Sequence, residues 1–244
     1  MCRQPLSQRY GSPDGRLATV QCPLVAALVL PRRFRAVLFD MDGLLLDSEP
    51  LWIGAEAELL ERHGDRLTEA DREVSHGRAL RDSASAYSKR LGGIDPALIE
   101  VELLELMRAR YLAGAPLHRG AAELVQALVG RVRLGVATST PTLLAELALR
   151  GAGLLDAFEI VASGSDLGAG KPDPTVFLEG CRLLSTDPEH AIAFEDSPVG
   201  VRAASAAGLF VVGVPDRPGV APALIAAGAD LLIDSLEDVV VEAA

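Results

Sequence analysis

Two aspartates one residue apart, Asp40 and Asp42, end a run of four apolar residues and precede Gly43. The run, residues 36–39, has the length of a strand that is buried on both faces of a parallel sheet. Ligands of such sheets gather at the carboxyl ends of the strands, so both carboxylates would face one crevice if the chain stays extended through Met41. Two like charges at a buried site are costly unless a cation joins them or one carries a proton. The pair therefore predicts a reactive site, although Asp42 could instead be a turn residue before the glycine.

Thr138 and Ser139 follow a second apolar run, residues 134–137, just before the expected start of a helix at Thr142. Hydroxyl and backbone N–H groups at the carboxyl end of a strand, close to a helix N-terminus, favour an anion. Thr138 could also simply cap the helix, and capping is compatible with phosphate binding. We therefore expect an anion-binding turn here.

Glu195 and Asp196 follow a third apolar run, residues 191–194, in the same manner, and a solvated loop is the alternative interpretation. Lys171 lies in a proline-containing loop just before another expected helix. It and Lys89 are the only lysines of a chain that otherwise uses arginine for positive charge. An ammonium is a compact charge that suits a phosphoryl oxygen, whereas a guanidinium is a broad planar fork. Lys171 is therefore a candidate ligand of an anion, and Lys89 is interpreted as part of a solvated helix face.

The elements that must position these residues alternate between short apolar runs and longer helical segments from residue 34 onward. Such alternation is typical of a parallel sheet with crossover helices. The sequence therefore predicts an α/β fold with a Rossmann-like parallel sheet core and helices on both faces. Strands are expected at 36–39, 134–137, 159–162, 191–194, 210–214 and 231–233, and helices at 121–128, 142–150, 174–184, 198–207 and 221–227.

The interval between Asp47 and Pro116 breaks this rhythm, because it contains no convincing strand. Its apolar spacing predicts amphipathic helices at 51–62, 69–73, 80–91 and 96–112. One βα crossover needs only about a dozen residues, so the excess indicates an inserted all-helical domain. Its position over the strand ends is typical of a lid. The expected boundaries are 34–47 and 117–244 for the core and 48–116 for the cap.

Composition limits the classes of function. The chain has 244 residues, 49% of them apolar, and a formal net charge of −11. A nucleic-acid-binding surface is disfavoured, because phosphate neutralisation needs clustered Lys and Arg. An anionic substrate would need a local positive site or a metal to offset the negative net charge of the chain. The three cysteines are scattered and lack metal-ligand spacing, which predicts a reducing, cytoplasmic setting without disulfides.

Residues 1–33 differ from the rest of the chain. Arginines precede an apolar stretch at 24–30, a pattern that loosely resembles a signal peptide. Pro23 interrupts that pattern, however, and prolines and arginines at 31–33 stand where a small-residue cleavage site would be expected. The stretch is also too short to span a membrane. We therefore expect a poorly ordered N-terminal extension, and no membrane partner.

The motifs together resemble those of the haloacid dehalogenase-like superfamily of phosphotransferases, from about Phe34 to the C-terminus. The helical insertion is similar to that superfamily's small α-helical cap. Residues 47–52 and 195–200 most resemble the sugar-phosphate branch, which includes hexitol and 2-deoxyglucose-6-phosphate phosphatases and β-phosphoglucomutase. The residues that match the four motifs, in order, are Asp40 with Asp42, Thr138 with Ser139, Lys171, and Glu195 with Asp196.

The resemblance implies that Asp40 attacks phosphorus and forms an aspartyl-phosphate. Asp42 would protonate the leaving sugar oxygen and then take a proton from the hydrolytic water, which requires it to be protonated when substrate arrives. Thr138, Ser139 and Lys171 would stabilise charge on the phosphoryl oxygens.

The resemblance also implies Mg²⁺ as the cofactor. It would be held by the Asp40 side chain, the Asp42 carbonyl and Asp196, with Glu195 binding directly or through water.

The activity implied is therefore that of a Mg²⁺-dependent phosphatase acting on small phosphorylated sugars or sugar alcohols, as a monomer or weak homodimer. A hexose-phosphate mutase is the alternative. The phosphoglucomutase branch has a lid histidine where this chain has Trp52, and Lys and Asn where it has Pro141 and Thr142, which weakens the mutase reading. Trp52 itself could be lid core or a sugar-stacking surface. A non-catalytic binding module of the same family is a third possibility, but every motif residue is present.

Overall fold

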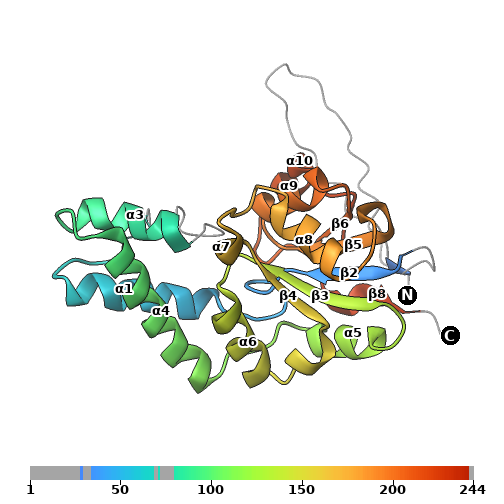
Figure 1. Ribbon diagram of the computed structural model, residues 1–244, viewed down its shortest axis with the longest axis horizontal. Helices are drawn as coiled ribbons and strands as arrows, with labels where there is room; N and C mark the ends of the chain where they lie inside the picture. Colours follow the sequence, from blue (N-terminus) through green and yellow to red (C-terminus); the bar gives the residue numbers. More distant parts are fainter. Residues whose placement is uncertain (1–27, 30–33, 69–70, 72–79, 242–244) are drawn as a thin grey trace, which may run out of the picture.

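The structure is a computed structural model that describes residues 28–29, 34–68, 71 and 80–241 (Figure 1). Most of the expected helix at 69–73 and of the expected extension at 1–33 lies outside these ranges. Leu28–Val29 forms a short strand, β1, that pairs in parallel with β8, Val239–Val240.

Six parallel strands of the described chain form the central sheet, in the order β4-β3-β2-β5-β6-β7. The first strand of the core, β2, is central: Phe39 is in register with Val136 of β3 on one side and with Phe194 of β5 on the other. The prediction of an α/β fold with a parallel sheet is confirmed. The strands are β2 (Ala36–Phe39), β3 (Arg133–Thr138), β4 (Ile160–Ser163), β5 (Ala191–Glu195), β6 (Phe210–Gly213) and β7 (Leu231–Leu232).

Helices cover both faces of the sheet, as the sequence predicted (Figure 1). Alternate residues of β2 serve the two faces: Val37 and Phe39 belong to one apolar cluster with α5 and α6, and Ala36 and Leu38 belong to another with α8, α9 and α10. All four residues are at most 1% exposed, which explains the uninterrupted apolar run. The helices of the core are α5 (Ala121–Leu128), α6 (Thr142–Gly151), α7 (Gly164–Leu167), α8 (Thr175–Leu183), α9 (Pro198–Ala206) and α10 (Ala221–Ala227).

Apart from the helix at 69–73, the bounds of the strands and helices that the sequence predicted lie within two residues of the observed ones. Short elements were not predicted, among them α7, where the Ser163 hydroxyl accepts a hydrogen bond from the Asp166 N–H and caps a single turn. A four-residue helix is too short to leave a periodic pattern in the sequence.

The helical insertion lies beside the sheet as a separate layer, at the left of Figure 1. Its described helices are α1 (Glu49–Arg62), α3 (Leu80–Arg90) and α4 (Pro96–Ala113). Asp95 caps α4 by accepting a hydrogen bond from the Ala97 N–H. Pro96 is in the first turn of the helix, where a backbone N–H would have no partner within the helix, so proline is tolerated there. The alpha-helical cap predicted between the first strand and residue 117 is therefore present.

Two segments connect the cap to the core, and they lie side by side. The Asp47 N–H donates to the Pro116 carbonyl at 2.9 Å, and the His118 N–H donates to the Leu45 carbonyl at 3.0 Å. The chain therefore leaves the core after β2 and returns to it before α5 at one place.

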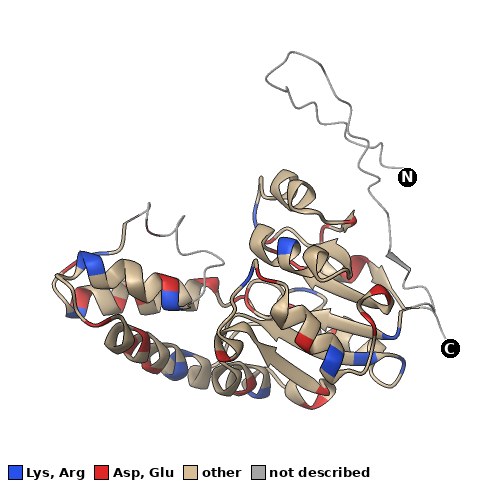
Figure 2. Ribbon diagram, turned by 45° about the horizontal axis from the view of Figure 1, so that its top comes forward, with Lys and Arg blue, Asp and Glu red and all other residues tan. Residues whose placement is uncertain are grey.

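Charged residues occur along both the core and the cap in the part of the chain that is described (Figure 2). Among the described helices, none has the length and hydropathy needed to cross a bilayer.

Candidate active site

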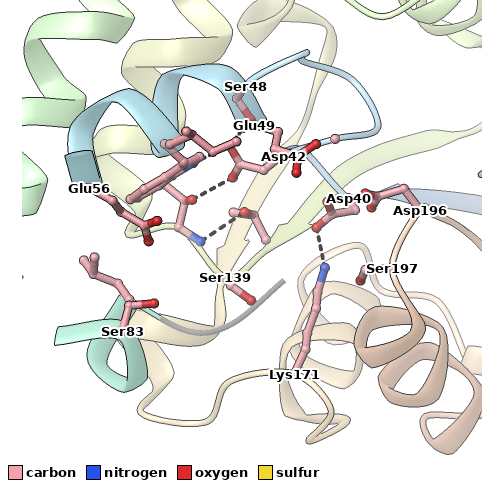
Figure 3. A pocket seen from close by; sticks show the side chains of 16 residues that line it. Asp40, Asp42, Ser48, Glu49, Glu56, Ser83, Ser139, Lys171, Asp196 and Ser197 are labelled. Carbon is pink, nitrogen blue, oxygen red and sulfur yellow. Dashed lines mark hydrogen bonds and ion pairs between the residues drawn. The ribbon is translucent and has the colours of Figure 1, made fainter. Parts of the chain in front are cut away.

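A pocket lies at the carboxyl ends of the central strands, between the sheet and the cap (Figure 3). Its volume, with the open mouth included, is about 980 Å³. Asp40, Ser139 and Lys171 line it from the core, and Glu56 and Ser83 face it from the cap. All of the candidate site residues named from the sequence line this pocket except Glu195, which is buried directly beneath it against Lys171.

Asp40 stands at the end of β2, where its N–H donates to the Phe194 carbonyl of the adjacent strand at 3.0 Å. Its side chain is buried and forms an ion pair with Lys171. Burial raises the pKa of Asp40 to about 7; the Lys171 charge opposes this increase, and the charges of Glu195 and Asp42 add to it. The carboxylate is thus held in a position where its negative charge needs a positive partner.

Lys171 supplies such a partner to two carboxylates at once. Its Nζ contacts Asp40 and lies 2.6 Å from Glu195 Oε1, and it is placed 5.2 Å from the centroid of the Phe177 ring. Burial by itself would lower the pKa of Lys171, but the charges of Asp40 and Glu195 outweigh it and raise that pKa. Lys171 is therefore a cation throughout the neutral pH range.

Glu195 ends β5 and Asp196 follows it; they are 0% and 3% exposed. The Ser197 hydroxyl donates to Glu195 Oε2 at 3.2 Å. Gly200, in the first turn of α9, leaves room for Glu195, because a Cβ there would lie 2.0 Å from the Glu195 carboxylate. Burial, together with the charges of Asp40 and Glu195, raises the pKa of Asp196 well above its usual value.

Three of these groups could hold a divalent cation. One carboxylate oxygen from each of Asp40, Glu195 and Asp196 lies within 4.8 Å of the other two, the one such group among the residues whose positions are described. Asp196 Oδ1 is buried and has no hydrogen-bond partner, as expected for an oxygen that binds a cation. Gly43, at φ +89°, permits this arrangement, since a Cβ there would lie 2.3 Å from Asp196 Oδ2. Carboxylate oxygens are hard donors that suit Mg²⁺.

The Asp42 carboxylate is not one of these three groups, and it is surrounded by donors. Oδ1 accepts hydrogen bonds from the Ser48 hydroxyl at 2.6 Å, the Tyr111 hydroxyl at 2.6 Å and the Trp52 indole N–H at 3.2 Å. Oδ2 accepts from the Thr140 hydroxyl at 2.7 Å. Burial, followed by the charge and hydrogen bond of Asp42, raises the pKa of Tyr111 well above its usual value, so the phenol stays a donor. The two aspartates thus occupy unlike environments.

Thr138 ends β3 and Ser139 follows it, on the opposite side of β2 from Glu195 and Asp196. Thr138 is 1% exposed, and its hydroxyl oxygen accepts from the Thr140 N–H at 3.1 Å, which leaves the hydroxyl proton available to a ligand. Ser139 is half-buried and lines the pocket. The turn therefore offers donors on the side of Asp40 opposite to the candidate cation site.

Sequence reasoning did not find the residues that surround Asp42, namely Ser48, Tyr111 and Thr140. Thr140 had a signal, because it lies two residues after Thr138 in a turn already selected. No signal in the sequence pointed to Tyr111, since 69 residues separate it from Asp42. Trp52 packs against the apolar core and also lines the pocket.

Comparison with known proteins agrees with this geometry. The profile of the haloacid dehalogenase-like hydrolase family matches residues 34–208. The chain is 34% identical over 207 residues to validoxylamine A 7'-phosphate phosphatase of Streptomyces hygroscopicus subsp. limoneus, covering 84% of this chain and 96% of that protein. It is 33% identical over 212 residues to the phosphorylated carbohydrates phosphatase of Thermotoga maritima, covering 81% and 93%. The chain therefore belongs to the haloacid dehalogenase-like hydrolase family.

Within that family its activity is that of a phosphatase, a phosphoric monoester hydrolase. The fold is also similar to the crystal structure of CbbY from Rhodobacter sphaeroides in complex with xylulose-(1,5)bisphosphate. That match has a TM-score of 0.75 and 29% identity, and it covers 83% of this chain and 95% of that one.

Proposed function

We propose that the protein is a Mg²⁺-dependent phosphatase that hydrolyses small phosphorylated sugars or sugar alcohols through an aspartyl-phosphate on Asp40. The observation that carries the proposal is the surroundings of Asp40. Its buried carboxylate contacts Lys171 on one side and lies beside the carboxylate of Asp196 on the other, at the base of a pocket that the cap covers. A nucleophilic carboxylate needs positive partners before a phosphate dianion can approach it. Lys171 is one, and a cation held by Asp40 and Asp196 would be the other.

In the first step, a carboxylate oxygen of Asp40 attacks phosphorus and the bond between phosphorus and the sugar oxygen breaks. Asp42 gives its proton to the leaving oxygen. In the second step, Asp42 takes a proton from water, the water oxygen bonds to phosphorus, and the bond between phosphorus and Asp40 breaks. Phosphate leaves, and both aspartates return to their initial states.

The remaining residues bind and orient the phosphoryl group. Lys171 and the hydroxyls of Thr138 and Ser139 would donate to the phosphoryl oxygens, whose charge increases in the transition state. Asp40, Asp196, the Asp42 carbonyl and Glu195 would hold Mg²⁺, which when bound offsets the repulsion between the Asp40 carboxylate and the phosphate. The buried Asp196 Oδ1 without a partner supports this assignment.

The substrate class is inferred from the cap side of the pocket and from the relatives. Ser48, Glu49, Glu56 and Ser83 bring hydroxyl and carboxylate oxygens to the pocket, and Trp52 brings an indole. Such groups hydrogen-bond sugar hydroxyls and pack against a sugar face. The curated relatives named above act, by their names, on a phosphorylated validoxylamine and on phosphorylated carbohydrates.

A panel of phosphorylated metabolites tests the proposal through phosphate release by the purified chain with Mg²⁺. The panel includes hexose 6-phosphates, fructose 1-phosphate, sorbitol 6-phosphate and glycerol 3-phosphate, with nucleotides as a contrasting class. We expect phosphate release from sugar or sugar-alcohol phosphates that exceeds release from nucleotides. Absence of release from every member would overturn the proposal and favour a non-catalytic module. Conversion of glucose 1-phosphate to glucose 6-phosphate without free phosphate would instead show a mutase.

A further inference from the structure

The two oxygens of the Asp42 carboxylate have unequal surroundings. Oδ1 accepts from Tyr111, Ser48 and Trp52, which belong to the cap or its junction with the core. Oδ2 accepts from Thr140 of the core, the one side-chain donor recorded for it among the described residues. One oxygen is therefore surrounded by donors, and the other keeps free acceptor capacity.

The chemistry of the donors distinguishes the two oxygens further. A hydroxyl can accept a hydrogen bond as well as donate one, but an indole N–H can only donate. Oδ1 receives three donors, and one of them, the Trp52 N–H, cannot accept in return. Oδ2 receives a single hydroxyl, which can turn to accept, so Oδ2 has more room for a transferable proton.

Tyr111 makes one of the two shorter contacts to Oδ1, and it comes from behind the pocket. It lies in the last turn of α4, is 1% exposed, and does not line the pocket. Substrate therefore cannot displace its hydroxyl, whereas Ser48, Trp52 and Thr140 all line the pocket and face any ligand there. Tyr111 is the donor to Asp42 that remains in place when substrate is bound.

We propose that Tyr111 is a positioning residue for the acid and base of the reaction. Its hydroxyl fixes Asp42 Oδ1, so that Oδ2 faces the oxygen that leaves phosphorus. This inference rests on the proposed role of Asp42. It adds a residue that no motif of the sequence marked, in the final helix of the cap, 69 residues from the aspartate that it orients.

Variants of Tyr111 can be tested with two aryl phosphates that share a shape and differ in the leaving group. 4-Nitrophenolate leaves without protonation, whereas phenolate is a much stronger base and needs an acid. The quantity to compare is kcat/KM with Mg²⁺, because it reports the steps up to departure of the leaving group and not the later hydrolysis of the aspartyl-phosphate. Tyr111→Phe removes the hydroxyl and keeps the ring that packs in the core.

We expect Tyr111→Phe to lower kcat/KM for phenyl phosphate about tenfold, the effect of one lost hydrogen bond. For 4-nitrophenyl phosphate we expect a change of less than about twofold, because that reaction needs little acid catalysis. Tyr87→Phe is the matched control, since Tyr87 is a buried tyrosine of the cap that does not line the pocket. Equal losses with the two substrates, or no loss with phenyl phosphate, would overturn the proposal.

Two further variants keep the result decisive. Trp52→Phe also removes a donor from Oδ1, and it should show the same preference for the better leaving group if Tyr111→Phe does not fold. Asp42→Asn removes the acid itself. If Asp42→Asn discriminates between the substrates and Tyr111→Phe does not, the positioning role alone is wrong. If Asp42→Asn does not discriminate, the acid role of Asp42 in the proposed function is wrong as well.

Discussion

Lys171 Nζ lies 2.6 Å from Glu195 Oε1, and both side chains are at most 4% exposed. The same ammonium also contacts Asp40, so one cation is shared by two buried carboxylates. Removing one partner from a buried ion pair is costly because it leaves charge uncompensated, and here two carboxylates would be left. The position of Lys171 therefore bears on both the stability and the chemistry of the site.

Lys171→Met should abolish most activity and destabilise the fold. We expect kcat/KM for 4-nitrophenyl phosphate to fall by at least about 100-fold, because a donor to the phosphoryl oxygens is lost. The free energy of unfolding at pH 7 should fall by about 3–5 kcal/mol, measured by urea denaturation without metal. Lys89→Met, at an exposed position of α3, is the control and should change neither quantity. An active Lys171→Met variant would contradict the assignment.

Gly43→Ala should weaken binding of Mg²⁺. The added Cβ would lie 2.3 Å from Asp196 Oδ2, and φ is +89° at this position, so both the contact and the backbone conformation oppose it. The matched control is Gly64→Ala, at φ +78° with no atom within 4 Å of the added Cβ, which has the backbone strain alone. We expect the Mg²⁺ concentration at half-maximal activity to rise at least about tenfold for Gly43→Ala and to stay unchanged for Gly64→Ala. Equal behaviour of the two variants would show that Asp196 is not a ligand.

The stability of the metal-free protein should fall as the pH rises from about 4 to about 7. Burial raises the pKa of Asp40 from 3.8 to about 7 and that of Asp196 in the same direction. Between the unfolded and folded pKa values the folded protein binds more protons than the unfolded chain does, so the free energy of unfolding decreases with pH. In Asp40→Asn the free energy of unfolding should therefore decrease less steeply with pH than in the unmodified protein.

Urea denaturation at pH 5 and pH 8, with EDTA and with excess Mg²⁺, measures this effect. Stabilisation by Mg²⁺ should be larger at pH 8, because the cation competes with protons for the same oxygens. If, without metal, the free energy of unfolding changes with pH equally in the unmodified protein and in Asp40→Asn, the account of the site is wrong.

Thr140→Val should lower kcat/KM for phenyl phosphate about tenfold, because Asp42 Oδ2 loses the hydroxyl with which it exchanges a hydrogen bond. Thr140→Ser keeps the hydroxyl and should retain activity within about threefold. Valine removes the hydrogen bond and keeps the volume of threonine, whereas serine keeps the hydroxyl and removes volume from this buried turn. If valine and serine behave alike, the hydroxyl of Thr140 has no part in the reaction.

The positions of the reactive residues could be predicted because they obey one rule of parallel sheets. Asp40, Thr138, Glu195 and Asp196 each come at or directly after the end of a buried strand, and the apolar runs that mark those strands are visible in the sequence. The cap was predictable for a similar reason, since the interval after β2 is far longer than one crossover needs.

The contacts around Asp42 could not be predicted in this way. Tyr111 reaches Asp42 only because α4 packs against α1 and ends beside the core, and a helical pattern does not reveal where its last turn lies in space. The role of Gly200 was equally hidden, because the space that it leaves for Glu195 depends on how closely α9 approaches β5. Such relationships depend on tertiary packing.

The most direct test of the account is chemical identification of the group that receives the phosphoryl group. The protein is mixed with 4-nitrophenyl phosphate and Mg²⁺, quenched in acid during turnover, digested and analysed by mass spectrometry. We predict a phosphoryl group on Asp40 in the unmodified chain, and neither that adduct nor phosphate release above background with Asp40→Asn. A phosphoryl group on another residue, or undiminished phosphate release by Asp40→Asn, would contradict the account.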